Sequence, residues 1–456
     1  MIHLFDFDGT KIVLDVNSGT VHVFDEVAWS LLKDYGRLTE KELIEKHGGQ
    51  WGADSVLEAL GEIQKLKQEG RLYSPDPYQE KRNAKGGSIT KALCLHLAHS
   101  CNLRCRYCFA GQGRFGGADE LMSAETGCRA IDFLIRRSGG RKRLEIDFFG
   151  GEPLLNLKVL QELVEYGKKR GGEEDKEIKF TVTTNAVLLD ENVSRYLIDN
   201  GISVVLSLDG RREIHDRMRP FPGGGGSFET VLPRIKNFLD MRERSYHLID
   251  GTYAYIRGTY TRYNLDFGAD VVNLANLGFK RISMEPVVAP ADADYSIREE
   301  DLPFLFSQYE QLAREMLLRR KKGNEIDFFH FNIDLEGGPC LQKRLSGCGA
   351  GHEYMAVAPN GDLYPCHQFV GRDRYLMGNV LEGVVDEDLA ASFRSAHVYN
   401  KERCPECWAK FYCGGGCHAN AETFNGSIFK PYGYGCALVK KRLECAIYLK
   451  VMEKLL

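Results

Sequence analysis

Alternating apolar and polar positions dominate the beginning of the chain. Apolar residues at every second position flank two turn signals, Asp8-Gly9 and Asn17-Ser18-Gly19. A period of two is typical of strands with one buried face, and such turns join neighbouring strands, so the pattern predicts a three-stranded meander. The alternating apolar positions are Phe5, Phe7, Ile12, Leu14, Val16, Val21 and Val23.

Helical periodicity replaces the alternation after this meander. Thr39 and Glu42 have the spacing of a capping box, which opens a helix. A stripe of apolar residues with a 3.6-residue period follows and stops at Gly70. The members of the stripe are Leu57, Leu60, Ile63 and Leu66. With a short strand predicted at Leu72-Tyr73, the strands and three helices predict a winged-helix-like domain over residues 1–75.

Residues 76–90 are charged and punctuated by proline and glycine, and we interpret them as a linker. From about residue 90 to residue 290, β-rich runs alternate with helical patterns, and a long helix is predicted over 297–322. The predicted strands lie near 91–97, 144–149, 178–184, 203–208, 250–258 and 280–287. Six βα units predict an α/β fold with a parallel sheet, in which loops after the strands build the active site.

Composition narrows the possible partners. The chain has 456 residues, enough for two or three domains with their own cores. A formal net charge of −4 and a pI near 6.3 argue against nucleic acid or an anionic membrane as a partner. The N-terminus does not resemble a signal peptide, and no apolar run approaches the ~20 residues that span a bilayer. We therefore expect a cytoplasmic protein.

Fourteen cysteines are the unusual feature of the composition. In a cytoplasmic chain such a number indicates metal or redox chemistry rather than disulfides. Five cysteines lie between residues 94 and 128, and nine lie between residues 340 and 445. The long interval between the two groups predicts two metal-binding modules.

The first module is a loop with C-x3-C-x2-C spacing. Cys101, Cys105 and Cys108 follow the apolar run 92–98. Three thiolates are one short of the four that fill a four-iron cluster or a structural zinc site, so one iron would stay open to another ligand. Three buried cysteines in a turn are the alternative, which the polar residues between them disfavour. The spacing resembles the radical S-adenosylmethionine (SAM) motif, in which the open iron binds the amino and carboxylate groups of SAM.

The resemblance extends to motifs at the ends of the next predicted strands. Phe149-Gly150-Gly151-Glu152-Pro153 is similar to the family's GGEP element and implies that Glu152 contacts the SAM amino group. The resemblance implies that Tyr107, Gly150, Gly151, Asn185, Ser207, Asp209 and Arg219 also form the cofactor site. Arg219 would pair with the SAM carboxylate, for which a guanidinium fork is well suited; a surface arginine is the alternative. The family's fold is a partial (β/α)6 barrel, expected here over residues 91–320.

The second module contains the thiolates that two four-iron clusters need. Zinc knuckles are the alternative, since C-x2-C is also zinc spacing. The pattern resembles the SPASM domain, expected over residues 321–456, which carries two auxiliary clusters. The resemblance implies that Cys340, Cys348, Cys366 and Cys417 hold the first cluster, and that Cys404, Cys407, Cys413 and Cys436 hold the second. If Cys340 does not bind iron, the first cluster has an open position. Cys94, Cys128 and Cys445 are expected to be buried free thiols.

The order of the parts and the opening sequence resemble the SCIFF maturases, named for precursor peptides with six cysteines in forty-five residues. The resemblance implies that residues 1–75 are a precursor-peptide recognition element that takes a leader peptide as an added strand. A DNA-binding winged helix is the alternative, but residues 1–75 lack a strongly basic helix. The implied cofactors are three [4Fe-4S] clusters and SAM. The implied partners are a Cys-rich precursor and an electron donor such as a ferredoxin or flavodoxin.

The SCIFF resemblance implies thioether bonds from a cysteine sulfur to the α-carbon of another residue, made by a 5′-deoxyadenosyl radical. One alternative is an anaerobic sulfatase maturase that forms formylglycine. That family places aspartate after the third SPASM cysteine, whereas His367 follows Cys366 here. The other alternative is a non-enzymatic iron–sulfur redox protein, which would have no reason to gather a SAM pocket at the strand ends.

Overall fold

In a computed structural model, the chain is described over residues 1–79, 89–248, 251–335 and 341–455, with the side chains of 341–343 excepted. The N-terminal strands β1 (Ile2–Phe7), β2 (Thr10–Asp15) and β3 (Val21–Phe24) form the predicted antiparallel meander in the order β1-β2-β3. Asp8 and Gly9 join β1 to β2 with φ of 52° and 79°, as a tight two-residue hairpin turn requires.

Three helices follow this meander: α1 (Glu26–Asp34), α2 (Glu40–Trp51) and α3 (Ala53–Gln68). The capping box is confirmed, because Thr39 and Glu42 exchange reciprocal hydrogen bonds at the start of α2. The short strand predicted at Leu72-Tyr73 is wrong. Leu72 is buried against α1 and α3, and Tyr73 has a φ of 53°, which strand pairing does not allow.

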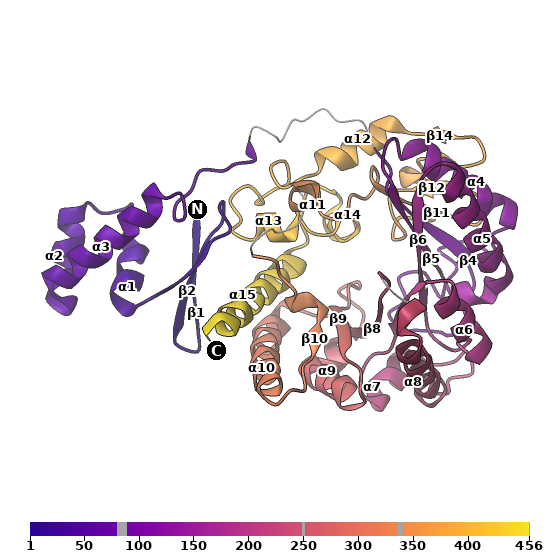
Figure 1. Ribbon diagram of the computed structural model, residues 1–456, viewed down its shortest axis with the longest axis horizontal. Coiled ribbons are helices and arrows are strands. Elements are labelled where there is room, and N and C mark those ends of the chain that lie inside the picture. The colour runs from indigo at the N-terminus through magenta and orange to yellow at the C-terminus, as the bar shows by residue number, and fades with distance from the viewer. Residues whose placement is uncertain (80–88, 249–250, 336–340, 456) are drawn as a thin grey trace.

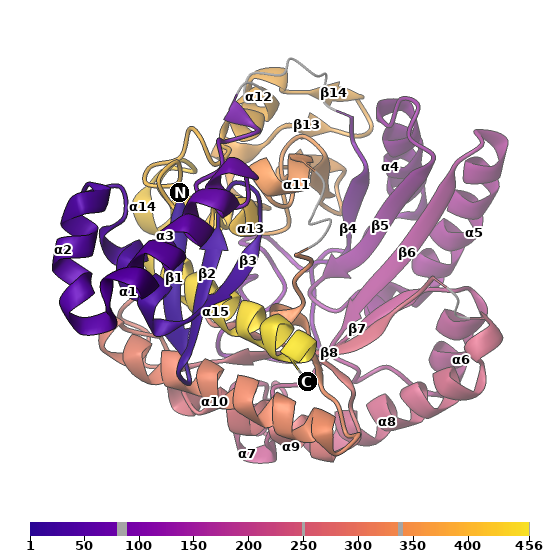
Figure 2. The same cartoon turned by 60° about the vertical axis from the view of Figure 1, so that its left-hand side comes forward.

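The N-terminal sheet packs on two sides. Val13 faces the small core of α1 and α3, whereas Phe5, Phe7, Ile12 and Leu14 join the main core of the molecule. Figure 2 shows the sheet lying across the C-terminal helix α15 (Gly433–Leu455). Phe7 stacks on Tyr448 of that helix with ring centroids 3.9 Å apart. Residues 1–75 therefore bury apolar surface against the rest of the chain.

The large sheet has the strand order β10-β9-β8-β7-β6-β5-β4-β11-β12-β13-β14. Strands β4 to β10 pair in parallel, so the predicted α/β fold is confirmed, and a short seventh parallel strand, β10, extends it. The bounds are β4 (Ala92–Ala98), β5 (Arg143–Gly150), β6 (Glu177–Thr184), β7 (Ser203–Ser207), β8 (Ala254–Tyr260), β9 (Arg281–Pro286) and β10 (Asp327–Phe328).

Helices cover the outer face of these strands (Figure 1). They are α4 (Ala124–Arg137), α5 (Leu157–Glu173), α6 (Glu191–Asp199), α7 (Arg212–Met218), α8 (Phe228–Arg244), α9 (Phe267–Asn276) and α10 (Leu302–Lys321). Single 3-10 turns are η2 (Pro153–Asn156), η3 (Tyr246–Leu248), η4 (Arg262–Asn264), η5 (Glu299–Asp301), η6 (Phe329–Phe331) and η7 (Asp373–Tyr375).

The C-terminal part continues the same sheet. Strand β11 (Tyr354–Val357) pairs in parallel with β4, although about 260 residues separate them, and β12 (Asp362–Tyr364), β13 (Gly378–Asn379) and β14 (Val384–Val385) follow as antiparallel strands. The helices of this part are α11 (Leu341–Ser346), α12 (Glu387–Ser395), α13 (Lys410–Cys413), α14 (His418–Asn425) and α15. Among the described residues, every helix is too short or too polar to cross a bilayer.

Candidate functional site

The cysteine loop leaves the sheet at the carboxyl end of β4. Its backbone is tied to the chain after α7, because Arg104 N donates to Pro220 O (2.8 Å) and Arg106 N donates to Met218 O (2.9 Å). Arg104 also donates through its guanidinium to Cys101 O (2.6 Å). These bonds hold the loop beside Arg219, which lies between the two acceptor residues in the sequence.

The three thiols of this loop are free and lie within electrostatic range of one another. Burial, and then the negative charge of Glu152 and Cys108, raises the pKa of Cys101 to about 11. Burial also raises the pKa of Cys105 to about 12, while the nearby Arg219 lowers it. The structure therefore gathers the thiols and one cationic side chain in a desolvated place, which suits an anionic iron–sulfur cluster.

Two glycines let the second loop approach the cysteine loop. Gly151 N donates to Ala98 O (2.7 Å) and Glu152 N donates to Ser100 O (2.9 Å). A Cβ on Gly151 would lie 2.1 Å from Ser100 O, and Gly150 has a φ of 124°. Both positions need glycine because the two backbones meet without room for a side chain.

Glu152 is fully buried under these loops. Its Oε1 accepts from Leu154 N (3.1 Å) and from the Thr184 hydroxyl (2.8 Å), and its Oε2 accepts from Asn185 N (2.8 Å). A carboxylate offers about four acceptor positions, so one on Oε2 stays available for a donor such as an amino group. Burial raises the pKa of Glu152 to about 7. The Asn185 side chain turns toward the cysteine loop and donates to Asn102 Oδ1 (2.7 Å).

Three further predicted residues form a buried chain of polar contacts. The Tyr107 hydroxyl donates to Asp209 Oδ2 (2.6 Å) and accepts from Arg219 Nη1 (2.8 Å). Arg219 Nη1 lies 3.8 Å from Asp209 Oδ1, and its Nε has no hydrogen-bond partner among the described residues. A buried guanidinium with a free N–H is a binding position for a carboxylate. Ser207 ends β7 on the same edge of the sheet.

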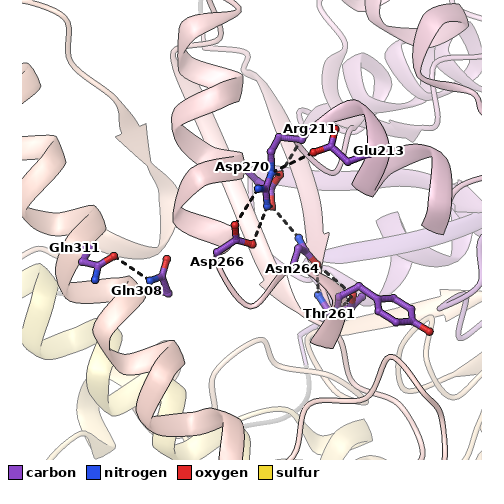
Figure 3. A network of polar contacts seen from close by, with 9 residues as sticks. Arg211, Glu213, Thr261, Asn264, Asp266, Asp270, Gln308 and Gln311 are labelled. Carbon is purple, nitrogen blue, oxygen red and sulfur yellow. Dashed lines mark hydrogen bonds and ion pairs between the residues drawn. The ribbon is translucent and has the colours of Figure 1, made fainter.

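A network of charged residues lies next to Asp209 in the turn after β7. It was not predicted from the sequence. Arg211 lies between Asp266 and Asp270, donating to both oxygens of Asp266 at 2.8 and 2.9 Å (Figure 3). Asn264 donates to Asp270 (2.9 Å), which is fully buried. Because Arg211 follows Asp209 by two residues, this network fixes the turn after β7. Only the general rule that arginine pairs with nearby aspartates could have suggested it.

The C-terminal cysteines separate into two sets. Burial first, and then the charges of Cys417 and Cys348, raise the pKa of Cys366. Burial raises the pKa of Cys404 to about 12, and its charged neighbours include Cys413, Cys436 and Cys407. These interactions place Cys348 and Cys417 near Cys366, as one set, and Cys407, Cys413 and Cys436 near Cys404, as the other. Cys340 lies outside the described residues.

Three glycines in the left-handed region separate Cys413 from Cys417, with φ of 65°, 88° and 70° at Gly414, Gly415 and Gly416. This turn lets neighbouring cysteines belong to different sets. A cavity of about 190 Å³ lies between the end of β9 and the start of α15. Cys417 of one set and Cys413 and Cys436 of the other border it. All the described cysteines are free thiols, including Cys94, Cys128 and Cys445.

Polar side chains of the barrel interior were not predicted as site residues. The Tyr354 hydroxyl lies 3.2 Å from Nδ1 of His367, whose ring is 4.9 Å from the ring of Phe149. Burial, and then the charge of Arg257, lowers the pKa of His367 to about 4. Asp147 of β5 is partly buried, and desolvation, followed by the charge of Glu145, raises its pKa to about 7. The alternation of β5 could have identified Asp147 and Phe149 as inward-facing, whereas Tyr354 and His367 lie outside that strand.

Comparisons with known proteins agree with this geometry. Residues 95–253 match the family model of the radical SAM superfamily, and residues 348–408 match that of SPASM, an iron–sulfur cluster-binding domain. An uncharacterised protein of Methanocaldococcus jannaschii is 31% identical over 196 residues, which are 43% of this chain and 62% of that protein. A cysteine-type anaerobic sulfatase-maturating enzyme of Clostridium perfringens (strain 13) is 24% identical, over 78% of this chain and 95% of the enzyme.

The structure of Streptococcus suis SuiB bound to the precursor peptide SuiA has a TM-score of 0.53 at 16% identity and covers 95% of this chain and 98% of that chain. At this identity the likeness concerns the fold. The chain therefore contains a radical SAM domain and a SPASM domain on an α/β fold with a parallel sheet. A radical SAM domain implies one [4Fe-4S] cluster and SAM, and a SPASM domain implies additional clusters.

Proposed function

We propose that the protein is a radical SAM enzyme that installs thioether cross-links in a ribosomally made, Cys-rich precursor peptide. One observation carries the proposal. Three free thiols, Glu152 and the Tyr107–Asp209–Arg219 chain lie close together at one edge of the parallel sheet. Cys101, Cys105 and Cys108 would hold a four-iron cluster, which would supply the electron for reductive cleavage of SAM to methionine and a 5′-deoxyadenosyl radical. An electron carrier without SAM chemistry would not need this set of buried polar groups.

The chain's own residues bind and orient SAM in this proposal. Cys101, Cys105 and Cys108 hold the cluster. The free acceptor position of Glu152 takes the SAM amino group, and the free N–H of Arg219 takes its carboxylate. Asn185, Ser207 and Asp209 line the remaining wall, and Gly150 and Gly151 let the loop that carries Glu152 approach the cysteine loop. Burial of these groups excludes water from a reaction that makes a carbon radical.

The same proposal assigns two auxiliary [4Fe-4S] clusters to the C-terminal thiols. Cys348, Cys366 and Cys417, with Cys340, hold the first, and Cys404, Cys407, Cys413 and Cys436 hold the second. The grouping of the described thiols supports this division. Thioether formation removes two hydrogens from the peptide: a hydrogen atom passes to the 5′-deoxyadenosyl carbon, the thiol loses a proton, and the auxiliary clusters would accept the one electron that remains when the C–S bond forms. An external ferredoxin or flavodoxin of the cytoplasm supplies the first electron.

Residues 1–75 are proposed to bind the leader of the precursor. Within the part of the chain that the structure describes, strand β3 pairs with β2 alone, so its second edge has no strand partner there and could take an added strand. Asp15 N donates to Thr20 O, and the alternation of an antiparallel ladder then points Val23 N–H toward the open edge. SuiB, whose fold covers nearly the whole chain, has been solved with its precursor peptide, which supports a peptide substrate here.

Formylglycine formation on a sulfatase is the second candidate function. The Clostridium perfringens enzyme favours it, since this chain covers 95% of its length. His367 disfavours it, because this position after Cys366 holds an aspartate in that group of enzymes. The ring of His367 lies between Phe109, Phe149 and Tyr354. An imidazole therefore stands where those enzymes have a carboxylate that can act as a base.

Mass spectrometry of a precursor peptide tests the proposal. The enzyme would be co-produced with the Cys-rich peptide encoded beside its gene, and the peptide alkylated with iodoacetamide. We expect a loss of two hydrogens per bridge and one alkylated thiol fewer for each bridge. The Cys101→Ala/Cys105→Ala/Cys108→Ala variant is the control. Loss of sulfur from a cysteine, as formylglycine formation requires, would contradict the thioether proposal.

A further inference from the structure

Lys401 is a buried lysine in the segment between α12 and Cys404. Its side chain is 1% exposed and is among the largest fully buried side chains of the molecule. A buried ammonium is costly unless negative charge or acceptors surround it. Among the residues that the structure describes, the Lys401 ammonium forms no ion pair with a carboxylate; its recorded partner is the carbonyl of Gly415 (2.8 Å).

The position of Gly415 makes this contact informative. Gly415 is the middle residue of the turn between Cys413 and Cys417, where the chain passes from one cysteine set to the other. Its φ is 88°, and a Cβ there would lie 3.1 Å from Cδ of Lys401. The glycine turn therefore leaves the space that the lysine side chain fills, and the ammonium is held at the junction of the two sets.

Cysteines of both sets interact electrostatically with the ammonium. Its electrostatic partners are Cys404 and Cys413 of the second set and Cys348 and Cys417 of the first. Cys404 N also donates to the backbone carbonyl of Lys401 (3.3 Å), which fixes the lysine relative to the second set. In a fully thiolate-ligated four-iron cluster the net charge is negative and becomes more negative on reduction, so a cation held nearby stabilises the reduced state.

We infer that the positive charge of Lys401 raises the reduction potential of both auxiliary clusters, because the ammonium is held between them. This inference rests on the proposed ligand sets. The location between the sets is what separates it from an ordinary structural lysine. Lys410, for comparison, is also buried, but its Nζ lies 3.1 Å from Asp76 Oδ2, which neutralises its charge locally.

Redox titration of the full-length protein tests the inference. The Cys101→Ala/Cys105→Ala/Cys108→Ala background would be loaded with iron and sulfide under argon, so that the auxiliary clusters alone give electron paramagnetic resonance signals. Lys401→Met and Lys401→Gln remove the charge, Lys401→Arg keeps it, and Lys430→Met is a control at an exposed lysine with only a surface contact to Glu402. Iron content would be measured for every variant before titration.

We expect both signals to titrate at lower potential in Lys401→Met and Lys401→Gln, with at least a tenfold fall in the equilibrium constant for one-electron reduction, which is about 59 mV. Lys401→Arg should restore most of the shift, and Lys430→Met should change neither signal. Unchanged potentials at full iron content would overturn the inference. Loss of iron from both neutral variants would also overturn it, because Lys401 would then be needed only to hold the sets. Wild-type protein without auxiliary iron would instead refute the proposed ligand sets.

Discussion

The two cysteine regions differ in what surrounds their thiols. Beside Cys101, Cys105 and Cys108 lie a buried carboxylate, a buried guanidinium and a tyrosine, of which Glu152 and Arg219 retain free hydrogen-bonding capacity. Around the C-terminal sets lie glycine turns and the buried Lys401, whose ammonium donates to Gly415 O. In the proposed function, the first environment receives a ligand with amino and carboxylate groups. The second would enclose two clusters and hold the positive charge of Lys401 close to them.

Removing thiols from one region at a time should give the largest effects. Cys101→Ala/Cys105→Ala/Cys108→Ala should abolish 5′-deoxyadenosine formation and leave about eight iron atoms, two clusters' worth. Cys404→Ala/Cys407→Ala should lose iron as well but keep reductive SAM cleavage, measured with dithionite and chromatography. Undiminished cleavage in the first variant, or abolished cleavage in the second variant with its barrel cluster intact, would break the contrast between the regions.

Arg219→Ala should have the next largest effect. Truncating one member of a buried, hydrogen-bonded charge pair costs about 2–5 kcal/mol, so the KM for SAM should rise roughly 30-fold or more. Arg219→Lys should recover little, because a lysine lacks the planar fork. Arg217→Ala, two residues away and exposed, is the matched control and should leave the KM for SAM near its original value. Equal effects at both positions would argue against a carboxylate site at Arg219.

Tyr107→Phe should weaken SAM binding less. The hydroxyl bridges Asp209 and Arg219, and a hydrogen bond to a charged group contributes about 1.5–3 kcal/mol. Because Asp209 and Arg219 remain 3.8 Å apart and can still attract each other, we expect about a tenfold rise in the Kd for SAM. Equilibrium dialysis with the loaded enzyme would measure it. An unchanged Kd would show that the bridge does not support the ligand pocket.

Val23→Pro should have the smallest effect and should leave both cysteine regions untouched. It removes one N–H from the open edge of β3, and proline is tolerated on edge strands. Loss of about one backbone hydrogen bond, ~1 kcal/mol, should weaken precursor binding about fivefold while SAM cleavage is unchanged. Val23→Ala is the control for the side chain. Fluorescence anisotropy with a labelled precursor would measure binding, and equal affinity for both variants would argue against strand addition at this edge.

Local patterns predicted the elements whose partners lie nearby in the chain. The βα units and the cysteine loop follow from periodicity and spacing, because each of the strands β4 to β9 pairs with the strand that follows it in the chain. The pairing of β11 with β4 could not be predicted, since a four-residue apolar strand carries no mark of a partner 260 residues away. The packing of β1 against α15 could not be predicted either, because the two elements lie at opposite ends of the sequence. The alternation of Phe5 and Phe7 predicts a buried face but does not say which surface covers it.

The candidate site divides in the same way. Glu152 and Arg219 could be assigned because their motifs follow strand ends, where parallel sheets gather polar groups. The division of the C-terminal thiols needed a resemblance, because spacing alone allows many pairings of eight cysteines. Lys401 carried no signal in the sequence, because it stands in a run of charged residues, 401–403, that is typical of an exposed loop. Lys401 is buried because its side chain packs against the glycine turn at Gly415, and this contact cannot be read from the sequence.

Hydrogen transfer from the precursor to SAM tests the central claim most directly. A precursor would be synthesised in two forms, one with deuterium at the α-carbons of its non-cysteine residues and one with deuterium at the β-carbons of its cysteines. Each would be incubated with SAM, dithionite and the loaded enzyme. Thioether formation at an α-carbon predicts deuterium in 5′-deoxyadenosine from the first form and none from the second. Deuterium from the cysteine β-carbons alone would contradict the account and identify formylglycine chemistry.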